Sequence, residues 1–527
     1  MLDKIIINGT VIDGTGAPAK KCAVGIKDGK IVMNPQDFCA KETIDANGKI
    51  VCPGFIDAHS HGDRLIGKED GHLFKTPQGI TTELCGNCGD SDAPLGGAFK
   101  DEIVSGITRY SVEETSKWDT FDAFLSFVDR QKLSANARFY VGHNMLRRST
   151  MGYANRPATA SELDEMKQKL RLAMEAGAAG LSTGLIYIPS CYAGDDEVLE
   201  LAKVIATYDG IYASHIRNES DKVVESVQEV LDIGEKAGVR TNISHHKVQG
   251  MDNWGKQNVT LELIDKANAN GYHTTLDIYP YTRSMNVMRS CLPPWHFSDG
   301  TEAFVKRLKN DNVFREQLKC EMQDPTVEYD NFYRNSGGWD GVMIAYADAS
   351  VGAAGLTVSE YAKKLGKDPF DTYFDMLIEN KLRVGGVYQT MREEDMIQIA
   401  KSPYCVIGTD GCSLSWKHHG HPRGSAAFPQ AIDFFVKEKK VFTLEEMIYK
   451  MTGLTAERLL VPNKGLLKDG YDADILIFDY DNLKINANYT SPHEKTDGID
   501  EVIVGGQTVY KDLEFTGVYS GKVIRKK

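Results

Sequence analysis

Two histidines, His59 and His61, stand two residues apart at the end of the apolar run FIDA. Neighbouring side chains of a β-strand point to opposite faces, so this spacing puts both imidazoles on one face. Imidazole is a common ligand of zinc and related metals, and two rings on one face can bind the same ion. The pair therefore predicts a metal site at the end of a buried strand. The alternative interpretation is a pair of surface histidines.

Further histidines follow apolar runs in the same way. His215 ends the run IYASH, and His245 stands near the end of VRTNISHH. Taken singly, each could be a core histidine held by a backbone hydrogen bond. Beside the first pair, their placement favours one shared set of metal ligands. His246 points the other way and is assigned an outer or structural role, and His143, after ARFYVG, is a candidate hydrogen-bond donor in the pocket.

An acid and a thiol complete the candidate site. Asp410, in IGTDG, is a carboxylate that can bind a metal, hold its water and transfer a proton; the alternative is an ordinary turn aspartate. Cys88, in GNCG, would be a soft zinc ligand as a thiolate and could bridge two ions. The alternative is a buried, unreactive thiol. We assign Cys85 to that alternative, because three residues along a strand reverse the face, and the C-x-x-C pattern is therefore not interpreted as a redox pair.

All these side chains stand at the ends of short apolar runs that alternate with helical stretches. Residues 159–180 are an example: Thr159 or Ser161 can cap a helix whose apolar residues recur at helical spacing, and Gly177 ends it. Eight runs can be collected, namely FIDAHSH, ITTELCGNCG, ARFYVGHNM, GLSTGLIYI, IYASHIRNE, VRTNISHH, HTTLDIYPY and CVIGTDG. Strands alternating with helices predict an α/β fold with a parallel sheet. Eight of them favour a closed (β/α)8, TIM-like barrel, whose sites lie at the carboxyl ends of the strands. No Gly-rich dinucleotide fingerprint follows the first strand, which argues against an open nucleotide-binding sheet.

Three segments do not follow this alternation. Residues 1–52 and 462–527 consist of short strands joined by Gly turns, and we expect them to pair into one small β-sandwich. The hydrolase barrel would then occupy residues 53–461. Residues of about 285–342, rich in Asn, Asp, Arg and Trp, predict an insertion that folds over the barrel mouth as a lid.

Composition limits the partners and the compartment. With 42% hydrophobic and 26% charged residues, the chain is typical of a soluble globular protein rather than a disordered one. A net charge of −13 argues against nucleic acid or an anionic membrane as the main partner. The N-terminus has no export signal, no run approaches the roughly 18 apolar residues of a membrane span, and ten scattered cysteines predict reduced thiols. We therefore expect a cytoplasmic protein with a small-molecule substrate, and leave the oligomeric state open.

Through these motifs the sequence resembles the amidohydrolase superfamily and, within it, the D-aminoacylases, which are N-acyl-D-amino-acid deacylases. The resemblance covers nearly the whole chain, through PGFIDAHSHGD, QGITTELCGNCG, VGHNMLR, GLSTGLIYIP, YASHIRNE, ISHHK, LDIYPY, LPPW, GTDG, HPRGSAAFP and KGLLKDGYDADILIFD. HSHxD and GTDG occur across the superfamily, whereas GNCG, STGL followed by a tyrosine, and ISHHK are more specific to deacylases. Many members carry a carboxylated lysine on the fourth strand. GLSTGLIYI has no lysine, and a cysteine in the bridging position is similar to the D-aminoacylase arrangement.

The resemblance implies a role for each candidate residue. A tightly held Zn²⁺ would be bound by Cys88, His215 and His245. A weaker second position would be formed by His59, His61 and Asp410. The substrate α-carboxylate would be bound by residues matching Lys247, Tyr279 and Arg423. Buried carboxylates need such fixed cations to offset their desolvation. Tyr187 matches a tyrosine that polarises the scissile carbonyl.

The expected reaction is zinc-dependent hydrolysis of an N-acyl-D-amino acid to a carboxylate and a free D-amino acid, with Asp410 as base and then acid. A dipeptidase acting on D-residues is a near alternative. A cyclic-amide hydrolase of the hydantoinase or dihydroorotase type would be expected to carry the missing lysine. A non-catalytic scaffold on the same barrel is disfavoured by the complete set of candidate ligands.

Two segments depart from the family pattern. The stretch between Asp410 and Arg423 is longer than expected and contains His418 and His419, which we expect to be solvated. Arg283 and Arg289 follow YPY in the segment that should shape the side-chain pocket. Either could select an acidic substrate side chain, although a surface position is the simpler interpretation.

Overall fold

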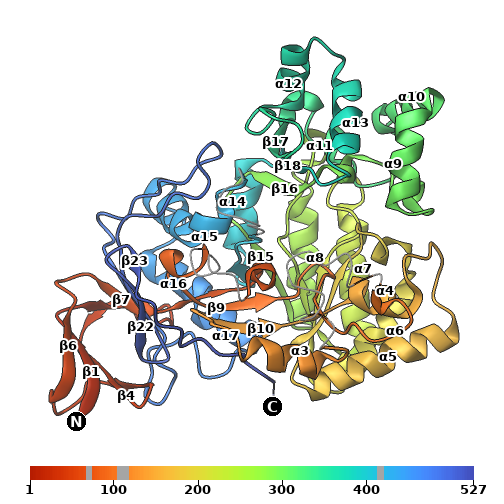
Figure 1. Ribbon diagram of the computed structural model, residues 1–527. Helices are drawn as coiled ribbons and strands as arrows, with labels where there is room; N and C mark the ends of the chain where they lie inside the picture. Colours follow the sequence, from red (N-terminus) through yellow and green to blue (C-terminus); the bar gives the residue numbers. More distant parts are fainter. Residues whose placement is uncertain (67–73, 102, 104–114, 116–117, 412–419, 527) are drawn as a thin grey trace.

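Parallel strands alternate with helices through the middle of the chain in the computed structural model (Figure 1). The structure describes residues 1–66, 74–101, 103, 115, 118–411 and 420–526. A three-stranded parallel sheet has the order β10-β9-β8, and a six-stranded parallel sheet has the order β11-β12-β13-β14-β15-β19. The bounds are β8 Phe55–Asp57, β9 Ile80–Cys85, β10 Asn136–Phe139, β11 Val141–Gly142, β12 Gly180–Gly184, β13 Ile211–His215, β14 Arg240–Ile243, β15 Thr274–Ile278 and β19 Cys405–Ile407. The expected α/β class is confirmed.

Short contacts join the two parallel sheets at both ends of the series. β10 and β11 are separated by Tyr140 alone. Next to β8, the backbone N–H of Ala58 donates to the carbonyl of Ile407 in β19 at 3.2 Å. Beyond these strands, Ser60 forms a parallel bridge with Gly411. The loops that follow the first and last strands therefore lie side by side.

Helices follow most of these strands and pack against one another in chain order. Their bounds are α3 Phe121–Val128, α4 His143–Met151, α5 Ala160–Glu175, α6 Asp195–Ala206, α7 Val223–Ala237, α8 Gln257–Ala269, α14 Glu393–Lys401, α15 Arg423–Ala431, α16 Leu444–Met451 and α17 Gly453–Arg458. In α5 the expected apolar face is buried through Met166, Leu170 and Ala173, and Thr159 forms a capping box with Glu162. The spacing of apolar residues therefore predicted this helix and its buried side.

The two ends of the chain share a pair of sheets on one side of the molecule, coloured red and blue in Figure 1. One sheet has the order β5-β4-β1-β6, with bounds β1 Leu2–Ile7, β4 Val24–Lys27, β5 Lys30–Met33 and β6 Ala40–Asp45. The other has the order β23-β22-β21-β20-β7-β2-β3, with bounds β2 Thr10–Val11, β3 Lys20–Lys21, β7 Ile50–Pro53, β20 Ile475–Phe478, β21 Ile499–Val504, β22 Gln507–Lys511 and β23 Glu514–Phe515. In it the N-terminal β7 pairs antiparallel with the C-terminal β20. One apolar cluster contains residues of both sheets.

Residues 283–389 form a separate layer, the inserted unit, at the top of Figure 1. Its antiparallel sheet has the order β16-β18-β17. The bounds are β16 Arg283–Val287, β17 Val342–Tyr346, β18 Gly385–Gln389, α9 Thr301–Asn310, α10 Asn312–Gln323, α11 Phe332–Asn335, α12 Val358–Leu365 and α13 Pro369–Glu379. All of these helices contribute to one apolar core. The unit continues past residue 342, the expected end of the insertion, because α12 and α13 pack on the same core as α9 and α10.

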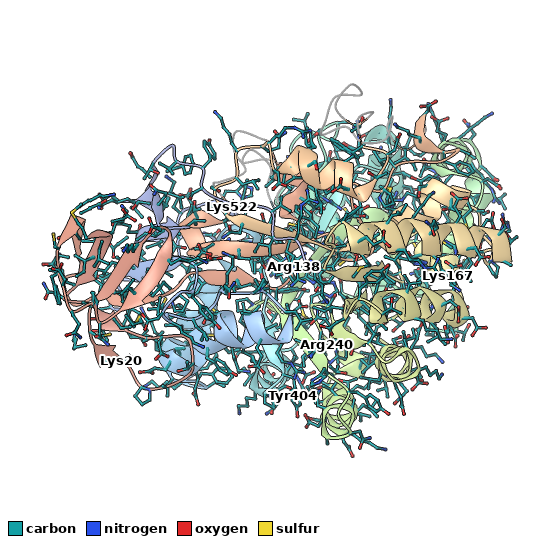
Figure 2. All side chains as sticks on the ribbon, turned by 90° about the horizontal axis from the view of Figure 1, so that it is seen from below. Lys20, Arg138, Lys167, Arg240, Tyr404 and Lys522 are labelled. Carbon is teal, nitrogen blue, oxygen red and sulfur yellow. The ribbon has the colours of Figure 1, made fainter. Side chains whose placement is uncertain are left out.

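The C-terminal segment also reaches the underside of the parallel strands, seen in Figure 2. Ala137 of β10 donates its backbone N–H to the carbonyl of Lys522 at 3.0 Å. The neighbouring Arg138 is buried and donates from Nη1 to the carbonyl of Leu459, just after α17, at 2.8 Å. None of the described helices combines the length and apolarity that a bilayer crossing requires. The cysteines within the described part of the chain are all free thiols.

Candidate metal centre

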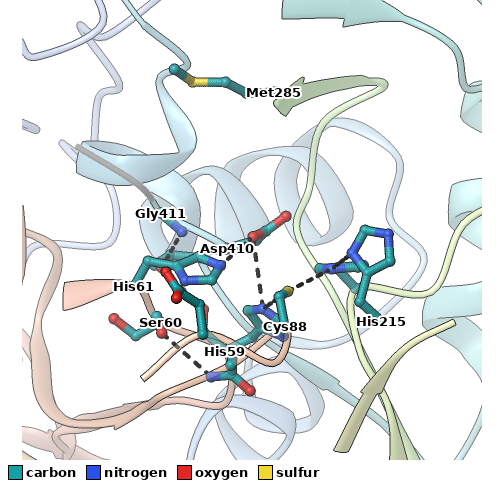
Figure 3. A network of polar contacts seen from close by, with 12 residues as sticks. His59, Ser60, His61, Cys88, His215, Met285, Asp410 and Gly411 are labelled. Atoms are coloured by element: carbon teal, nitrogen blue, oxygen red, sulfur yellow. Dashed lines mark hydrogen bonds and ion pairs between the residues drawn. The ribbon is translucent and has the colours of Figure 1, made fainter. Parts of the chain in front are cut away.

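The six side chains predicted to bind metal meet at the carboxyl edge of the parallel strands (Figure 3). Two come from the loop after β8, one from the loop after β9, one from the end of β13, one from the loop after β14 and one from the loop after β19. In that order they are His59, His61, Cys88, His215, His245 and Asp410, all of them buried. They form two groups, His59 with His61, Cys88 and Asp410, and Cys88 with His215 and His245. Cys88 belongs to both groups.

The ligand atoms of each group lie within 4.8 Å of one another, close enough to bind a common ion. Cys88 Sγ lies 3.3 Å from His59 Nε2 and 3.3 Å from His245 Nε2, which in turn lies 2.9 Å from His215 Nδ1. Asp410 Oδ1 lies 3.4 Å from His61 Nε2 and 3.7 Å from His59 Nε2. Nitrogen and sulfur ligands of tetrahedral zinc are about 3.3–3.6 Å apart, given Zn–N and Zn–S bonds of about 2.0 and 2.3 Å. The donor set, with imidazole, thiolate and carboxylate, fits zinc in chemistry and in spacing.

Three of these candidate ligands have an unusual backbone conformation. Cys88, His245 and Asp410 have φ angles of 54°, 36° and 46°, in the left-handed region that residues other than Gly seldom adopt. Such a conformation costs on the order of 1–3 kcal/mol per residue and is found mainly where function requires it. Backbone contacts hold two of them: Asp410 N donates to His59 O at 2.8 Å, and His245 N donates to Asp277 Oδ1 at 2.8 Å.

The electrostatic surroundings keep the thiol and the carboxyl ionised. Burial raises the pKa of Cys88, but the positive charges of His59 and His245 outweigh this effect and lower it well below 9.0. Burial also raises the pKa of Asp410, whereas Arg423 and His245 lower it well below 3.8. The site therefore favours the thiolate and the carboxylate, the ionised forms in which these side chains bind metals.

Buried carboxylates that the sequence analysis did not single out support the histidines from outside. Asp277 of β15 lies 3.3 Å from His59 Nδ1 with Oδ1, and its Oδ2 accepts a hydrogen bond from Asn242 at 2.7 Å. Glu219 lies 3.1 Å from His245 Nδ1. Histidines that bind metals usually donate their second N–H to such a carboxylate. Both acids stand in sequence runs already identified, LDIYPY and YASHIRNE, and this position could have indicated that they lie near the site.

A cavity of about 170 Å³ lies against the candidate metal ligands. Besides candidate metal ligands, four predicted site residues line it: Tyr187, Lys247, Tyr279 and Arg423. Residues of the inserted unit line it as well, namely Ser284, Met285, Asn286, Val287, Arg289, Phe332 and Tyr346. Figure 3 shows Met285 across the cavity from Asp410. The inserted unit thus contributes part of the wall, and its role as a lid stays a prediction.

The cavity side chains have specific partners. Arg423 places Nη1 2.8 Å from Asp410 Oδ2, and its guanidinium lies 4.6 Å from the centre of the Tyr279 ring. Tyr187 accepts a hydrogen bond at its hydroxyl from Asn286 at 3.1 Å, and its ring centre lies 5.1 Å from that of His215. The tyrosine therefore stands directly beside a candidate metal ligand.

Other candidates lie elsewhere or outside the described residues. His143 does not belong to the described lining of the cavity, and Ser190 and Glu197 contact its two ring nitrogens, each at 2.8 Å. Its contacts favour a structural role over the expected contact with substrate. Arg289 lines the cavity, whereas the guanidinium of Arg283 lies 4.6 Å from the ring centre of Tyr489. His418 and His419 lie outside the described residues.

Comparison with known proteins places this geometry in a family. The model of the amidohydrolase family matches residues 42–285 and 405–510. D-aminoacylase of Alcaligenes xylosoxydans xylosoxydans is 30% identical over 526 residues, which cover 99% of this chain and 98% of that protein. The crystal structure of N-acyl-D-glutamate deacylase from Bordetella bronchiseptica, complexed with zinc and a phosphonate inhibitor, is similar with a TM-score of 0.82 and 31% identity, covering 99% of each chain. A crystal structure of D-aminoacylase is similar with a TM-score of 0.83 and 30% identity, covering 100% of each chain.

Proposed function

This chain belongs to the amidohydrolase family, and from that premise we propose that it is a zinc-dependent deacylase that hydrolyses N-acyl-D-amino acids to a carboxylate and a free D-amino acid. The observation that carries the proposal is the place of Cys88, whose Sγ is shared by two groups of candidate ligands. The fourth strand, β12, has the sequence GLSTG and no lysine. The cysteine would therefore take the bridging position that a carboxylated lysine has in many other amidohydrolases.

We infer that the parallel strands close into one (β/α)8 barrel within residues 53–461. The hydrogen bond from Ala58 to Ile407 supports closure, because it joins the first strand of the series to the last. The two terminal sheets, from residues 1–52 and 462–527, are inferred to form a small β-sandwich. The apolar cluster that contains Ile26 and Ile475 supports this, since these residues come from different sheets.

We propose that the two groups of candidate ligands bind zinc with different affinities. Cys88, His215 and His245 would hold the tightly bound zinc, and His59 and His61 with Asp410 the weaker second position. When bound, zinc supplies a Lewis acid that polarises a carbonyl and lowers the pKa of water. The shared thiolate offsets positive charge at both positions, so that both can be filled without strong repulsion.

Asp410 would transfer the proton in the reaction. Its Oδ1 faces His59 and His61, and its Oδ2 faces Arg423. From there the carboxylate can accept the proton of the attacking water and then deliver it to the departing amine nitrogen. Tyr187, whose hydroxyl accepts a hydrogen bond from Asn286, has its own proton available for the carbonyl oxygen as negative charge develops there.

The α-carboxylate of the substrate would be held by Lys247, Tyr279 and Arg423 at the cavity wall. Both cations are buried, so they meet the anion in a medium of low dielectric constant, where such pairs are strong. Arg423 would be shared between this carboxylate and Asp410, because its guanidinium carries several N–H donors. A cytoplasmic location and a small-molecule substrate remain our predictions for the intact protein.

A stereochemically paired panel tests the proposal. Purified protein loaded with zinc would be given N-acetyl-D-amino acids and their L-enantiomers, and the release of free amine would be measured. We expect release from D-substrates alone. Release confined to L-forms, or ring opening of hydantoins in place of deacylation, would overturn the proposal in favour of another amidohydrolase reaction.

A further inference from the structure

A single buried carboxylate, Glu219, lies behind both histidines that are grouped with Cys88. Its Oε1 is 3.1 Å from His245 Nδ1, and its Oε2 is 3.8 Å from His215 Nε2. The nitrogens that face the metal position are the opposite ones, His245 Nε2 and His215 Nδ1. His215 Nε2 has no hydrogen-bond partner within the described part of the chain. Glu219 therefore faces the outer nitrogen of each ring.

The same carboxylate lines the cavity and contacts two other side chains of its wall. Lys247 Nζ donates to Glu219 Oε1 at 2.6 Å and lies 2.7 Å from His245 Nδ1, which itself lies 3.1 Å from the same oxygen, so the three side chains meet at one point. Gln249 donates from Nε2 to Glu219 Oε2 at 2.6 Å. Both Lys247 and Gln249 line the cavity. One side chain thus links the outer side of the metal histidines to a cation proposed to bind the substrate carboxylate.

The inserted unit holds Glu219 in turn. The backbone N–H of Glu219 donates to Asp330 Oδ2 at 3.3 Å, and Ser220 Oγ donates to Asp330 Oδ1 at 2.9 Å. Asn335 of α11 donates to the same Oδ1 at 2.9 Å. Asp330 is buried in the segment that leads into α11. A carboxylate of the inserted unit therefore fixes the backbone from which Glu219 extends.

We propose that Glu219 is a positioning residue for His215, His245 and Lys247, and that Asp330 extends this control into the inserted unit. The proposal rests on the proposed zinc site. A carboxylate at the outer nitrogen selects the tautomer of a histidine ligand, orients its ring and increases its basicity. Loss of such a partner typically lowers metal affinity about 10–100-fold. The inserted unit would then act on the metal position as well as covering the cavity.

Zinc affinity of the apoprotein tests the proposal without substrate. The zinc dissociation constant would be measured by competition with a chromophoric chelator for the wild type, Glu219→Gln and Asp330→Asn. We expect affinity about 10–100-fold weaker in Glu219→Gln. Asp330→Asn should weaken zinc binding in the same direction by a smaller factor. In the loaded enzyme, Glu219→Gln should also raise KM more than it lowers kcat, because Lys247 loses the group that orients it.

Glu197 provides a matched control. It is also a buried glutamate that contacts a histidine, with Oε1 2.8 Å from His143 Nε2 and Oε2 2.6 Å from Arg147 Nη1, but it is not part of the described cavity lining. Glu197→Gln should lower the melting temperature and leave the zinc dissociation constant within about twofold, well below the change of about 10–100-fold expected for a lost ligand partner. This separates a role at the metal from the general cost of changing a buried charge.

Two results would overturn the proposal. One is wild-type zinc affinity in Glu219→Gln, and the other is an equal loss of affinity in Glu197→Gln. An unchanged constant in Asp330→Asn would remove the part assigned to the inserted unit. If Glu219→Gln does not fold, Glu219→Asp carries the same comparison, since it keeps the charge but withdraws it by one methylene. Failure of the D-substrate panel with weakened zinc in Glu219→Gln would reject the deacylase reaction and retain the positioning role.

Discussion

Cys88 is the residue that connects the two groups of candidate ligands, and its neighbours explain how it can. It follows β9, adopts a left-handed backbone conformation, and its thiolate is favoured by His59 and His245. Asp410 has the same kind of backbone and stands across the site, close to His61 and Arg423. The proposed chemistry therefore depends on single side-chain atoms, and substitutions that remove them should change zinc binding or turnover.

Replacing Cys88 by Ala should remove stoichiometric zinc, because both groups lose their sulfur ligand. Metal content after dialysis, measured by atomic spectroscopy, checks this. Cys85→Ala is the matched control, since Cys85 is a buried thiol of the apolar core three residues earlier. It should keep its zinc. Full zinc content in Cys88→Ala would contradict the bridging role.

Replacing Asp410 by Asn should abolish turnover and leave zinc bound at Cys88, His215 and His245. The loss of a general acid and base lowers kcat by about 10²–10⁴-fold. Steady-state kinetics together with metal analysis give both values. Asp395→Asn serves for comparison: Asp395 is equally buried but accepts a hydrogen bond from Arg392 on the outside of the molecule, at 3.0 Å. Near-normal turnover in Asp410→Asn would eliminate it as the acid and base.

At the scale of elements, the site joins loops from parallel strands to one antiparallel strand of the inserted unit. β16 carries Ser284, Met285, Asn286 and Val287 along the cavity wall, and it pairs with β18 in the unit's own sheet. The hydrogen bond from Asn286 to Tyr187 connects this strand to the loop after β12. The inserted unit therefore takes part in placing the tyrosine proposed to contact the carbonyl.

Asn286→Ala should lower kcat/KM by about fivefold, which is the loss expected for one hydrogen bond of roughly 1 kcal/mol at the reacting group. The effect should appear with every substrate that the enzyme accepts. Asn286 contacts Tyr187, which is proposed to donate to the scissile carbonyl, and every substrate has that carbonyl. Kinetics with two different N-acyl-D-amino acids check this. Asn310→Ala, in α9 of the same unit, removes a contact to the carbonyl of Lys306 and should leave both values unchanged. Equal kinetics for Asn286→Ala and the wild type would exclude β16 from placing Tyr187.

At the scale of the molecule, the terminal sheets and the parallel strands are joined by a buried polar contact. Asp474, just before β20, accepts hydrogen bonds from Lys464 at 2.5 Å, from Asn136 of β10 at 3.0 Å and from the backbone of Gly505 at 2.7 Å. It thus connects residues more than 300 positions apart in the chain. Such a contact stabilises the whole arrangement rather than the site.

Asp474→Ala should lower the free energy of unfolding by up to about 3–5 kcal/mol, because Lys464 loses its buried counter-charge and keeps only the more exposed Asp472, 3.0 Å away. Urea denaturation measures the change, and the zinc dissociation constant of the folded variant should stay at the wild-type value. Asp479→Ala, whose carboxylate contacts nearby Asn482, should cost far less. A stable Asp474→Ala variant would mean that the terminal sheets are held in place mainly by apolar contacts.

The sequence by itself determined the alternation of strands and helices and the candidate ligands. These depend on local patterns: an apolar run marks a buried strand, and a polar residue at its end, such as His59 or Asp410, must lie at the edge where parallel strands finish. The absence of a lysine from β12 could likewise be read from the sequence of that strand alone. Family resemblance then implied that Lys247 and Arg423 bind the substrate carboxylate and that Tyr187 polarises the carbonyl; these roles stay predictions for three side chains that line the cavity.

Only the tertiary structure decided which polar groups stand behind the ligands and how far the inserted unit extends. Glu219 and Asp330 are 111 residues apart, and no periodicity or motif relates two such positions. His143 ends its apolar run as His215 does, yet it contacts Ser190 and Glu197, because the side chains packed around a ring decide its partners. The sequence also did not predict the end of the inserted unit at Gln389, because that end depends on which helices pack into its apolar core. Contacts between distant segments arise from tertiary packing, and local sequence patterns do not predict which side chains that packing brings together.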